Sequence, residues 1–205
     1  MRVAALYDVH GVPAALEAVL AEVEPEAVDA IVFGGDLFLG SQPAEVAALL
    51  RSVDADFVRG NCDREPDEWT RSKLDGETLA WAQGWPLTVE HDGVLYCHAS
   101  PPERFDEALE GVDARLVVAG HTHMQFKRDR WVNAGAVGWP YEGDVAAFWA
   151  LISDDVEFRR TPIDVERVVS EMLESGWPEA ESFVAENLRA APSRAEATAH
   201  FESLA

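Results

Sequence analysis

The sequence predicts a layered α/β fold in which strands and helices alternate, followed by antiparallel hairpins. Three observations support this prediction. Short, nearly unbroken apolar runs are typical of strands buried on both faces. Apolar residues at helical spacing follow several of these runs. After Phe126 the texture changes to short alternating runs. The chain has 205 residues and 48% hydrophobic content, which is enough for the core of one domain.

The first half of the chain repeats one pattern. Residues 3–7 form an apolar run that predicts a buried strand, and the apolar positions within 16–23 have helical spacing. Residues 30–33 predict a second strand, and 46–53 carry a second helical stripe. Residues 57–59 predict a third, short strand. This alternation indicates parallel strands joined by helices.

The middle of the chain is less regular. Residues 65–85 mix tryptophans with charged side chains and predict helix and loop, whereas 94–97 and 116–119 are again apolar strands. Three alternating runs predict antiparallel hairpins, which we expect to form a second sheet. These runs are residues 127–131, 145–152 and 156–160.

Beyond Pro162 the pattern is helical. Asp164 is placed to cap a helix that Gly176 would end, and the spacing of Ser193 and Glu196 is that of a capping box. We therefore expect a catalytic domain over residues 1–162, with 163–205 as a C-terminal helical extension of the same domain. Whether this extension packs on the core, covers the site or forms a homo-oligomer is left open by its periodicity.

Charge and cysteine content limit the partners and the compartment. Thirty-eight acidic and sixteen basic residues give a net charge of −22, which repels nucleic acids and anionic membranes, so neither is an expected partner. Cys62 and Cys97 form no disulfide framework, which favours the cytoplasm. No apolar run reaches the roughly 20 residues of a membrane span.

Five clusters of polar residues, each at the end of an apolar run, carry the functional signal. They contain Asp8 and His10, Asp36, Asn61 to Asp63, His98, and His121 and His123. Carboxylates and neutral imidazoles are ligands of divalent metals. Because open α/β sheets place their sites at the carboxyl ends of strands, we expect one parallel sheet to bring these clusters together.

In this order the clusters resemble the calcineurin-like metallophosphoesterase superfamily, whose signature is DxH, GD, GNH[DE], H and GHxH. Residues 8–138 cover the pattern, and 133–138 look like the glycine-rich turn that follows it in the family. The small prokaryotic phosphodiesterase-like branch is the most similar. The resemblance implies a four-layer sandwich of two mixed β-sheets flanked by helices, with a C-terminal helical appendix.

The resemblance also implies two divalent metal ions with Asp36 as their bridge. The first would be held by Asp8, His10, Asp36 and His123, and the second by Asp36, Asn61, His98 and His121. A hydroxide between the ions would attack phosphorus in line with the leaving oxygen. Mn²⁺ is the first choice for mixed oxygen and nitrogen ligands, with Ni²⁺, Co²⁺, Fe²⁺ or Zn²⁺ as alternatives.

The chain departs from the family pattern at Cys62, where many members have the histidine that protonates the leaving group. A thiol lacks that basicity, so we expect esters with good leaving groups to react best. Family members with cysteine at this position are phosphodiesterases, so the resemblance implies phosphodiesters as the substrates. Asp63, Arg64 and metal-bound water are the candidate acids, which makes the predicted catalytic set Asp36, Asn61, Asp63 and Arg64. The alternatives are that Asp63 only caps the following helix and that Arg64 only pairs with an acid.

Other functions of this fold compete with a phosphodiesterase acting on a small ester. One is a phosphomonoesterase, including a phosphoprotein phosphatase, and another is a dinucleoside polyphosphate hydrolase. A third is a non-catalytic binding scaffold such as the retromer subunit of this fold. The scaffold is disfavoured because all seven ligand positions are filled.

Overall fold

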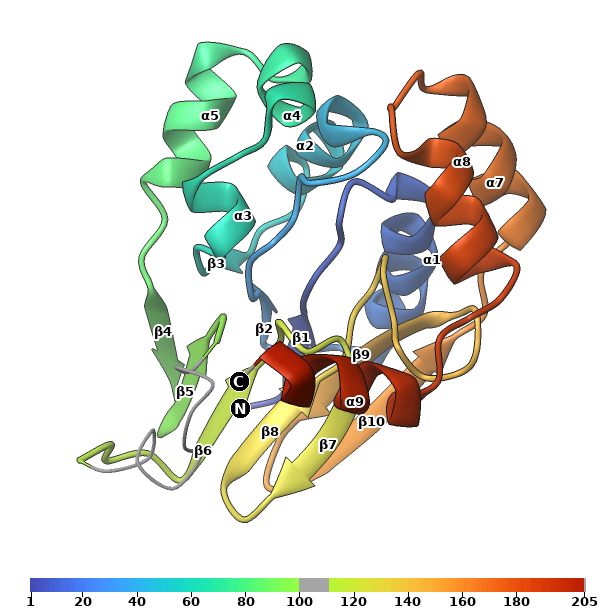
Figure 1. Cartoon of the computed structure of the whole chain (residues 1–205). Coiled ribbons are helices and arrows are strands. Elements are labelled where there is room, and N and C mark those ends of the chain that lie inside the picture. The colour runs from blue at the N-terminus through green and yellow to red at the C-terminus, as the bar shows by residue number, and fades with distance from the viewer. Residues whose placement is uncertain (100–110, 205) are drawn as a thin grey trace.

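The computed structural model describes residues 1–99 and 111–204 and contains two mixed five-stranded sheets with helices (Figure 1). The first sheet has the order β10-β9-β1-β2-β3 and the second has the order β4-β5-β6-β8-β7. In the first sheet β1, β2 and β3 run parallel, and in the second sheet β5, β6 and β8 run parallel. The remaining strands pair antiparallel to their neighbours. The predicted fold class, two mixed sheets with helices, is confirmed.

The strands of the first sheet are β1 (Val3–Leu6), β2 (Ala30–Phe33), β3 (Asp56–Phe57), β9 (Ala147–Ile152) and β10 (Val156–Thr161). Those of the second sheet are β4 (Thr88–His91), β5 (Val94–Cys97), β6 (Leu116–Ala119), β7 (Gln125–Arg128) and β8 (Trp131–Ala134). The helices before residue 162 are α1 (Pro13–Val23), α2 (Pro43–Arg51), α3 (Asn61–Arg64), α4 (Glu68–Lys73) and α5 (Gly76–Gln83), with a 3₁₀ turn at Glu24–Glu26.

Two expectations about the sheets were wrong. The ligand-bearing strands do not share one parallel sheet, because β1, β2 and β3 belong to the first sheet while β5 and β6 belong to the second. The hairpins also do not form a sheet of their own. The β9–β10 hairpin extends the first sheet antiparallel to β1, and β7 and β8 join the second. Residues 127–131 contain the turn between β7 and β8 rather than one strand.

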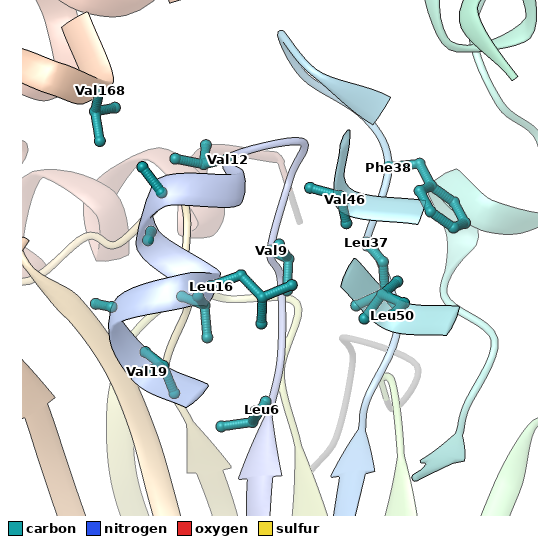
Figure 2. Packing of buried hydrophobic residues seen from close by; sticks show 14 of the residues in the cluster. Leu6, Val9, Val12, Leu16, Val19, Leu37, Phe38, Val46, Leu50 and Val168 are labelled. Carbon is teal, nitrogen blue, oxygen red and sulfur yellow. The ribbon is translucent and has the colours of Figure 1, made fainter. Parts of the chain in front are cut away.

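The alternation of side chains along β1 separates two cores. Leu6 faces the helices, whereas Ala5 and Tyr7 face the second sheet. In Figure 2 Val9, just beyond β1, lies between Leu16 of α1 and Leu37 from the loop after β2. The layer of helices therefore packs directly beneath the loops that follow β1 and β2, which gives these loops a rigid support.

The C-terminal helices join the helix-side core. They are α7 (Val165–Glu174), α8 (Ala180–Phe183), which continues into a π-helical turn at Val184–Leu188, and α9 (Arg194–Leu204). Asp164 caps α7 by accepting the N–H of Arg167 at 3.1 Å, as predicted. Val168 and Met172 are buried in the same cluster as α1, and Figure 1 shows α7 and α8 beside α1.

The two predicted ends of these helices are also present. Gly176 follows α7 with φ of 77°, a conformation that favours glycine. The N–H of Ser193 donates to Glu196 Oε2 at 2.8 Å and the N–H of Glu196 donates to Ser193 Oγ at 3.3 Å, which is the predicted capping box before α9. In the described part of the chain, no helix is both long and apolar enough to cross a membrane.

Candidate metal centre

The loops that carry the predicted ligands share an unusual backbone conformation. Five ligand residues have left-handed φ angles although none is glycine: Asp8 at 53°, His10 at 47°, Asp36 at 54°, His121 at 69° and His123 at 58°. Each such residue costs on the order of 1–3 kcal/mol and persists only where the surroundings enforce it. Strain of this kind gathers at functional sites, and here it turns the chain sharply after β1, β2 and β6.

Asp8, His10 and His123 form the first group of potential metal ligands. The Nε2 atoms of His10 and His123 lie 3.1 Å apart, and they lie 3.7 and 3.5 Å from Oδ1 of Asp8. Two ring nitrogens at this separation need a shared proton or a cation between them. The two donors and the carboxylate oxygen are within reach of one divalent ion.

The hydrogen bonds around the first group fit a metal better than they fit a closed polar network. Nδ1 of His10 lies 3.3 Å from the carbonyl of Leu39, which assigns the proton to Nδ1 and leaves the Nε2 lone pair for a cation. Among the described residues, Oδ1 of the fully buried Asp8 has no hydrogen-bond partner. A buried carboxylate oxygen without a partner is costly, and a bound cation would remove that cost.

Asp36, His98 and His121 form the second group. Nε2 of His98 lies 3.2 Å from Oδ2 of Asp36 and 3.1 Å from Oδ1 of Asn61, while Nδ1 of His98 faces the carbonyl of Gly34 at 2.9 Å. Asn61 is exposed, so this group opens more to solvent than the first. All seven predicted ligands are therefore brought to one place. The bridging role of Asp36 stays a prediction.

Backbone contacts hold the two groups side by side. The N–H of His121, from the second group, donates to Oδ2 of Asp8 in the first at 2.8 Å. A Cβ at Gly120 would lie 2.3 Å from that same oxygen, and one at Gly60 would lie 2.1 Å from Oδ1 of Asp36. These glycines are required because the backbone approaches each carboxylate too closely for any side chain.

The protonation states of the two groups differ. Burial, with the charge of His123 next, lowers the pKa of His10 to about 4, so His10 is neutral at pH 7. Burial would also lower the pKa of His98, but its hydrogen bond and attraction to Asp36 outweigh burial and raise that pKa to about 9. Without a cation, the second group thus holds a proton that a metal ion would have to displace.

The carboxylates of both groups are ionised. Burial alone would raise the pKa of Asp8 and of Asp36, but the neighbouring histidines, His123 beside Asp8 and His98 beside Asp36, lower both below their ordinary value. Two carboxylates that stay charged while buried are suited to hold cations.

Asp63 is buried and faces the backbone. Its carboxylate accepts N–H groups from Asp36 at 2.8 Å, Leu37 at 3.0 Å and Gly60 at 3.0 Å. Asp63 is the third residue of α3 and caps the start of that helix through the Gly60 N–H, whereas α4 is capped by Asp67, which accepts the N–H of Thr70. The geometry makes Asp63 a clamp for the loop that carries Asp36, while its predicted role as an acid stays a prediction.

Cys62 borders the second group, and Arg64 is the last residue of the same short helix, α3. The Arg64 side chain is exposed and its Nε lies 3.3 Å from Glu65, so it forms the predicted kind of ion pair and is also free to reach a substrate at the surface. The Cys62 thiol accepts a hydrogen bond from Asn61 Nδ2 at 3.2 Å, and its N–H donates to Asp36 Oδ1 at 2.8 Å. Burial and the charge of Asp36 raise the thiol pKa, so Cys62 is a neutral neighbour of the ligands.

Sequence reasoning missed three residues that support the site. Tyr7 contacts a ligand-bearing segment of each sheet. Its hydroxyl donates to the carbonyl of Val118 in β6 at 2.9 Å. A Cβ at Gly34, after β2, would lie 1.8 Å from its ring. Tyr141 stacks on His123 with ring centroids 5.1 Å apart. The buried Asn133 donates to Thr122 Oγ1 at 2.9 Å and fixes the loop with His121 and His123. A tyrosine directly before Asp8 was the only sequence signal for the first of these.

Two adjacent groups of potential metal ligands at the strand ends of two mixed sheets define a protein built to bind divalent metal ions. The family model for the calcineurin-like phosphoesterase superfamily domain matches residues 1–154. The chain belongs to this superfamily, and the resemblance drawn from the five motifs is confirmed.

Three similar proteins extend this comparison. The crystal structure of a metallophosphoesterase from Sphaerobacter thermophilus superimposes with a TM-score of 0.77 at 26% identity, covering 93% of this chain and 100% of that one. A hypothetical protein from Pyrococcus horikoshii OT3 shares the fold, with a TM-score of 0.74, 17% identity, and 94% and 99% coverage. An uncharacterized protein of Methanocaldococcus jannaschii is 23% identical over 230 residues, covering 86% of this chain and 94% of that protein.

Proposed function

We propose that this protein is a dinuclear metal-dependent phosphodiesterase that acts on a small phosphate ester. The observation that carries the proposal is the pair of adjacent groups, Asp8–His10–His123 and Asp36–His98–His121, each with ligand atoms within 4.8 Å of one another. Bound divalent ions would supply a nucleophile by lowering the pKa of water and would neutralise charge on the phosphoryl oxygens. Mn²⁺ is the metal that we propose first.

The protein's own residues would orient the ester. Asn61 and His121 lie on the open side of the site, so a phosphoryl group would enter there. The exposed Arg64 guanidinium, three positions after Asn61, is a suitable partner for a non-bridging oxygen of the ester. In a chain with a net charge of −22, this local cation would help to hold an anionic substrate.

Cys62 bears on which leaving group the substrate carries. Its neutral thiol cannot give a proton to a basic alkoxide as a histidine does, so leaving groups that need little protonation, such as phenolates and nucleotide phosphates, would react fastest. Aryl and nucleotide esters are the substrate class that follows.

The test is hydrolysis of an aryl phosphodiester and of the matched aryl phosphomonoester by the protein reloaded with Mn²⁺. We expect the diester to be hydrolysed faster. No turnover above the metal-free control with Mn²⁺, Ni²⁺ or Co²⁺ would contradict the proposal, and a faster monoester would replace it with a phosphomonoesterase. In a Cys62→His variant, a gain confined to the monoester would support the role assigned to position 62.

We also propose a cytoplasmic location. Cys62 and Cys97 are both free thiols, as expected in a reducing compartment. Fractionation of cells that express the native protein would test this, and recovery outside the cytoplasmic fraction would contradict it.

A further inference from the structure

The loop of residues 139–143 lies between the first ligand group and the C-terminal helices. On the side of the ligands, the Trp139 ring meets His10 edge-on, with centroids 5.2 Å apart, and lies 5.9 Å from His123. Tyr141 stacks on His123, and its N–H donates to the His123 carbonyl at 3.0 Å. The loop thus contacts both imidazoles of the first group.

The other side of Trp139 is held by the C-terminal extension. Its indole N–H donates to Oδ1 of Asn187 at 2.9 Å, and its ring packs against Phe183 with centroids 4.7 Å apart. Asn187 is itself fixed by a bond from its Nδ2 to the Phe183 carbonyl at 3.3 Å. The orientation of the indole beside His10 is therefore set by α8 and the π-helical turn after it.

A second attachment joins the far end of the loop to α9. The carboxylate of Glu142, whose side chain is only 6% exposed, pairs with Arg194, the first residue of α9. The same carboxylate accepts the N–H of Gln125 at 2.5 Å, two residues after His123. The N–H of Gly143 donates to the Pro192 carbonyl at 2.9 Å. The C-terminal extension therefore contacts loop 139–143 at both of its ends.

We propose that the C-terminal extension positions the first metal group. Asn187 and Arg194 are positioning residues: they hold loop 139–143, which in turn holds the imidazole rings of His10 and His123 in the orientation that binds a cation. The physical reason is that an imidazole whose ring is free to tilt loses affinity, and loss of one outer partner typically costs about 10–100-fold in metal binding. The second group does not stack on Trp139 or Tyr141 in the contacts above, so the effect should fall on the first.

The experiment separates the two groups with ligand variants of the full chain. A His98→Ala background leaves the first group intact, and a His10→Ala background leaves the second. Mn²⁺ affinity is measured in each by titration calorimetry and by electron paramagnetic resonance. We expect Asn187→Ala and Arg194→Ala each to weaken the first group by about tenfold, the low end for an outer partner, and to leave the second group within about twofold.

Matched variants distinguish positioning from general loosening. Asn187→Asp keeps the oxygen that accepts the indole N–H and should restore affinity, as should Arg194→Lys, which keeps the cation for Glu142. Met172→Ala removes a buried side chain of α7 but leaves in place the contacts that Asn187 and Arg194 make with loop 139–143, so it should leave the first group unchanged. Equal losses in both backgrounds, no loss in either, or a loss with Met172→Ala as large as with Asn187→Ala would overturn the inference.

Two safeguards keep the result decisive. If Asn187→Ala does not fold, Arg194→Ala tests the same claim through an exposed side chain. The inference rests on the metal-binding part of the proposed function, and the titrations contain no substrate. Absence of diester hydrolysis would therefore contradict the proposed function and leave this inference standing, whereas unchanged Mn²⁺ affinity would contradict only the inference.

Discussion

The two ligand groups lie side by side but are built differently. Asp8, His10 and His123 are buried. The imidazole rings of His10 and His123 pack against loop 139–143, and His10 is neutral. The second group, in contrast, includes the more exposed His121, borders the exposed Asn61, and keeps a proton on His98 in the absence of a cation. The difference teaches that the first group is enclosed and packed against neighbouring rings, whereas the second opens to solvent.

Asp36→Asn should break the second group most completely. The change removes the charge that faces His98 at 3.2 Å. We expect diester hydrolysis to fall at least about 10³-fold, because both activation of water and charge neutralisation depend on the cations. Mn²⁺ calorimetry should still detect binding at the first group. Loss of binding at both groups would show that Asp36 serves them equally, as a bridge does.

Asp63→Ala should destabilise the loop that carries Asp36. Three buried backbone N–H groups lose their acceptor, at about 1–3 kcal/mol for each group left unsatisfied. Urea unfolding of the metal-free protein should show a loss of about 3 kcal/mol or more, with weaker Mn²⁺ binding at the second group than at the first. The matched control is Asp67→Ala, which removes a helix cap for about 1 kcal/mol and should leave Mn²⁺ binding unchanged. Equal stability losses in the two variants would contradict the clamp.

The pH dependence of metal binding should differ between the groups. In the metal-free protein His98 has a pKa of about 9, so a cation entering the second group at pH 7 releases about one proton, and affinity there rises about tenfold per pH unit up to about pH 8.5. His10, with a pKa of about 4, releases none. Calorimetry in two buffers of different ionisation enthalpy measures the protons released. Equal numbers of protons released on metal binding at the two groups would contradict the predicted difference in protonation between His98 and His10.

The same shift has a consequence for the stability of the metal-free protein. The folded pKa of His98 is raised above its unfolded value of 6.5. Its contribution to stability is therefore fully present below about pH 6.5 and is lost as the pH rises through about 9. Urea unfolding in the presence of a chelator at pH 6, 7.5 and 9 would show this decline, and a His98→Ala variant should lack it.

Tyr7→Phe should have the smallest effect of these changes, and its effect on Mn²⁺ binding should be the same at both groups. The phenyl ring keeps its packing beneath Gly34 and Gly120, while the buried hydrogen bond to the Val118 carbonyl is lost. We expect about 1–2 kcal/mol lower stability by urea unfolding and no preferential loss of either Mn²⁺ site. A change confined to one group would show that the tyrosine supports that side only.

The positions of the seven candidate ligands were predictable because polar residues at the ends of buried runs are conspicuous in sequence. The sheet to which each run belongs was not. Val94–Cys97 and Val3–Leu6 look alike as apolar strands, but pairing partners depend on contacts between distant segments. The strand β4 (Thr88–His91) was not predicted because its residues are exposed or half-buried and include charged side chains. The β7–β8 turn was missed because Asp129 takes the left-handed conformation without a glycine.

The support behind the ligands was harder still to predict. The position of Trp139, directly after the glycine-rich turn, indicates that it lies near the site. Asn187 and Arg194, in contrast, lie about 50 residues further along the chain. No spacing rule links them to His10 and His123. Their contribution depends on how helices pack in three dimensions, and amphipathic periodicity predicts that a helix packs without specifying its neighbour.

The left-handed turns at five ligand residues bear on how the protein exchanges one ion for another. These φ angles fix the backbone from which the five side chains extend, so we expect a bound ion to rearrange little of the chain. Replacing Mn²⁺ by Ni²⁺ or Zn²⁺ should therefore leave the chain's trace unaltered. Competition between these ions would then depend on their radii and preferred geometries rather than on any adaptation of the scaffold.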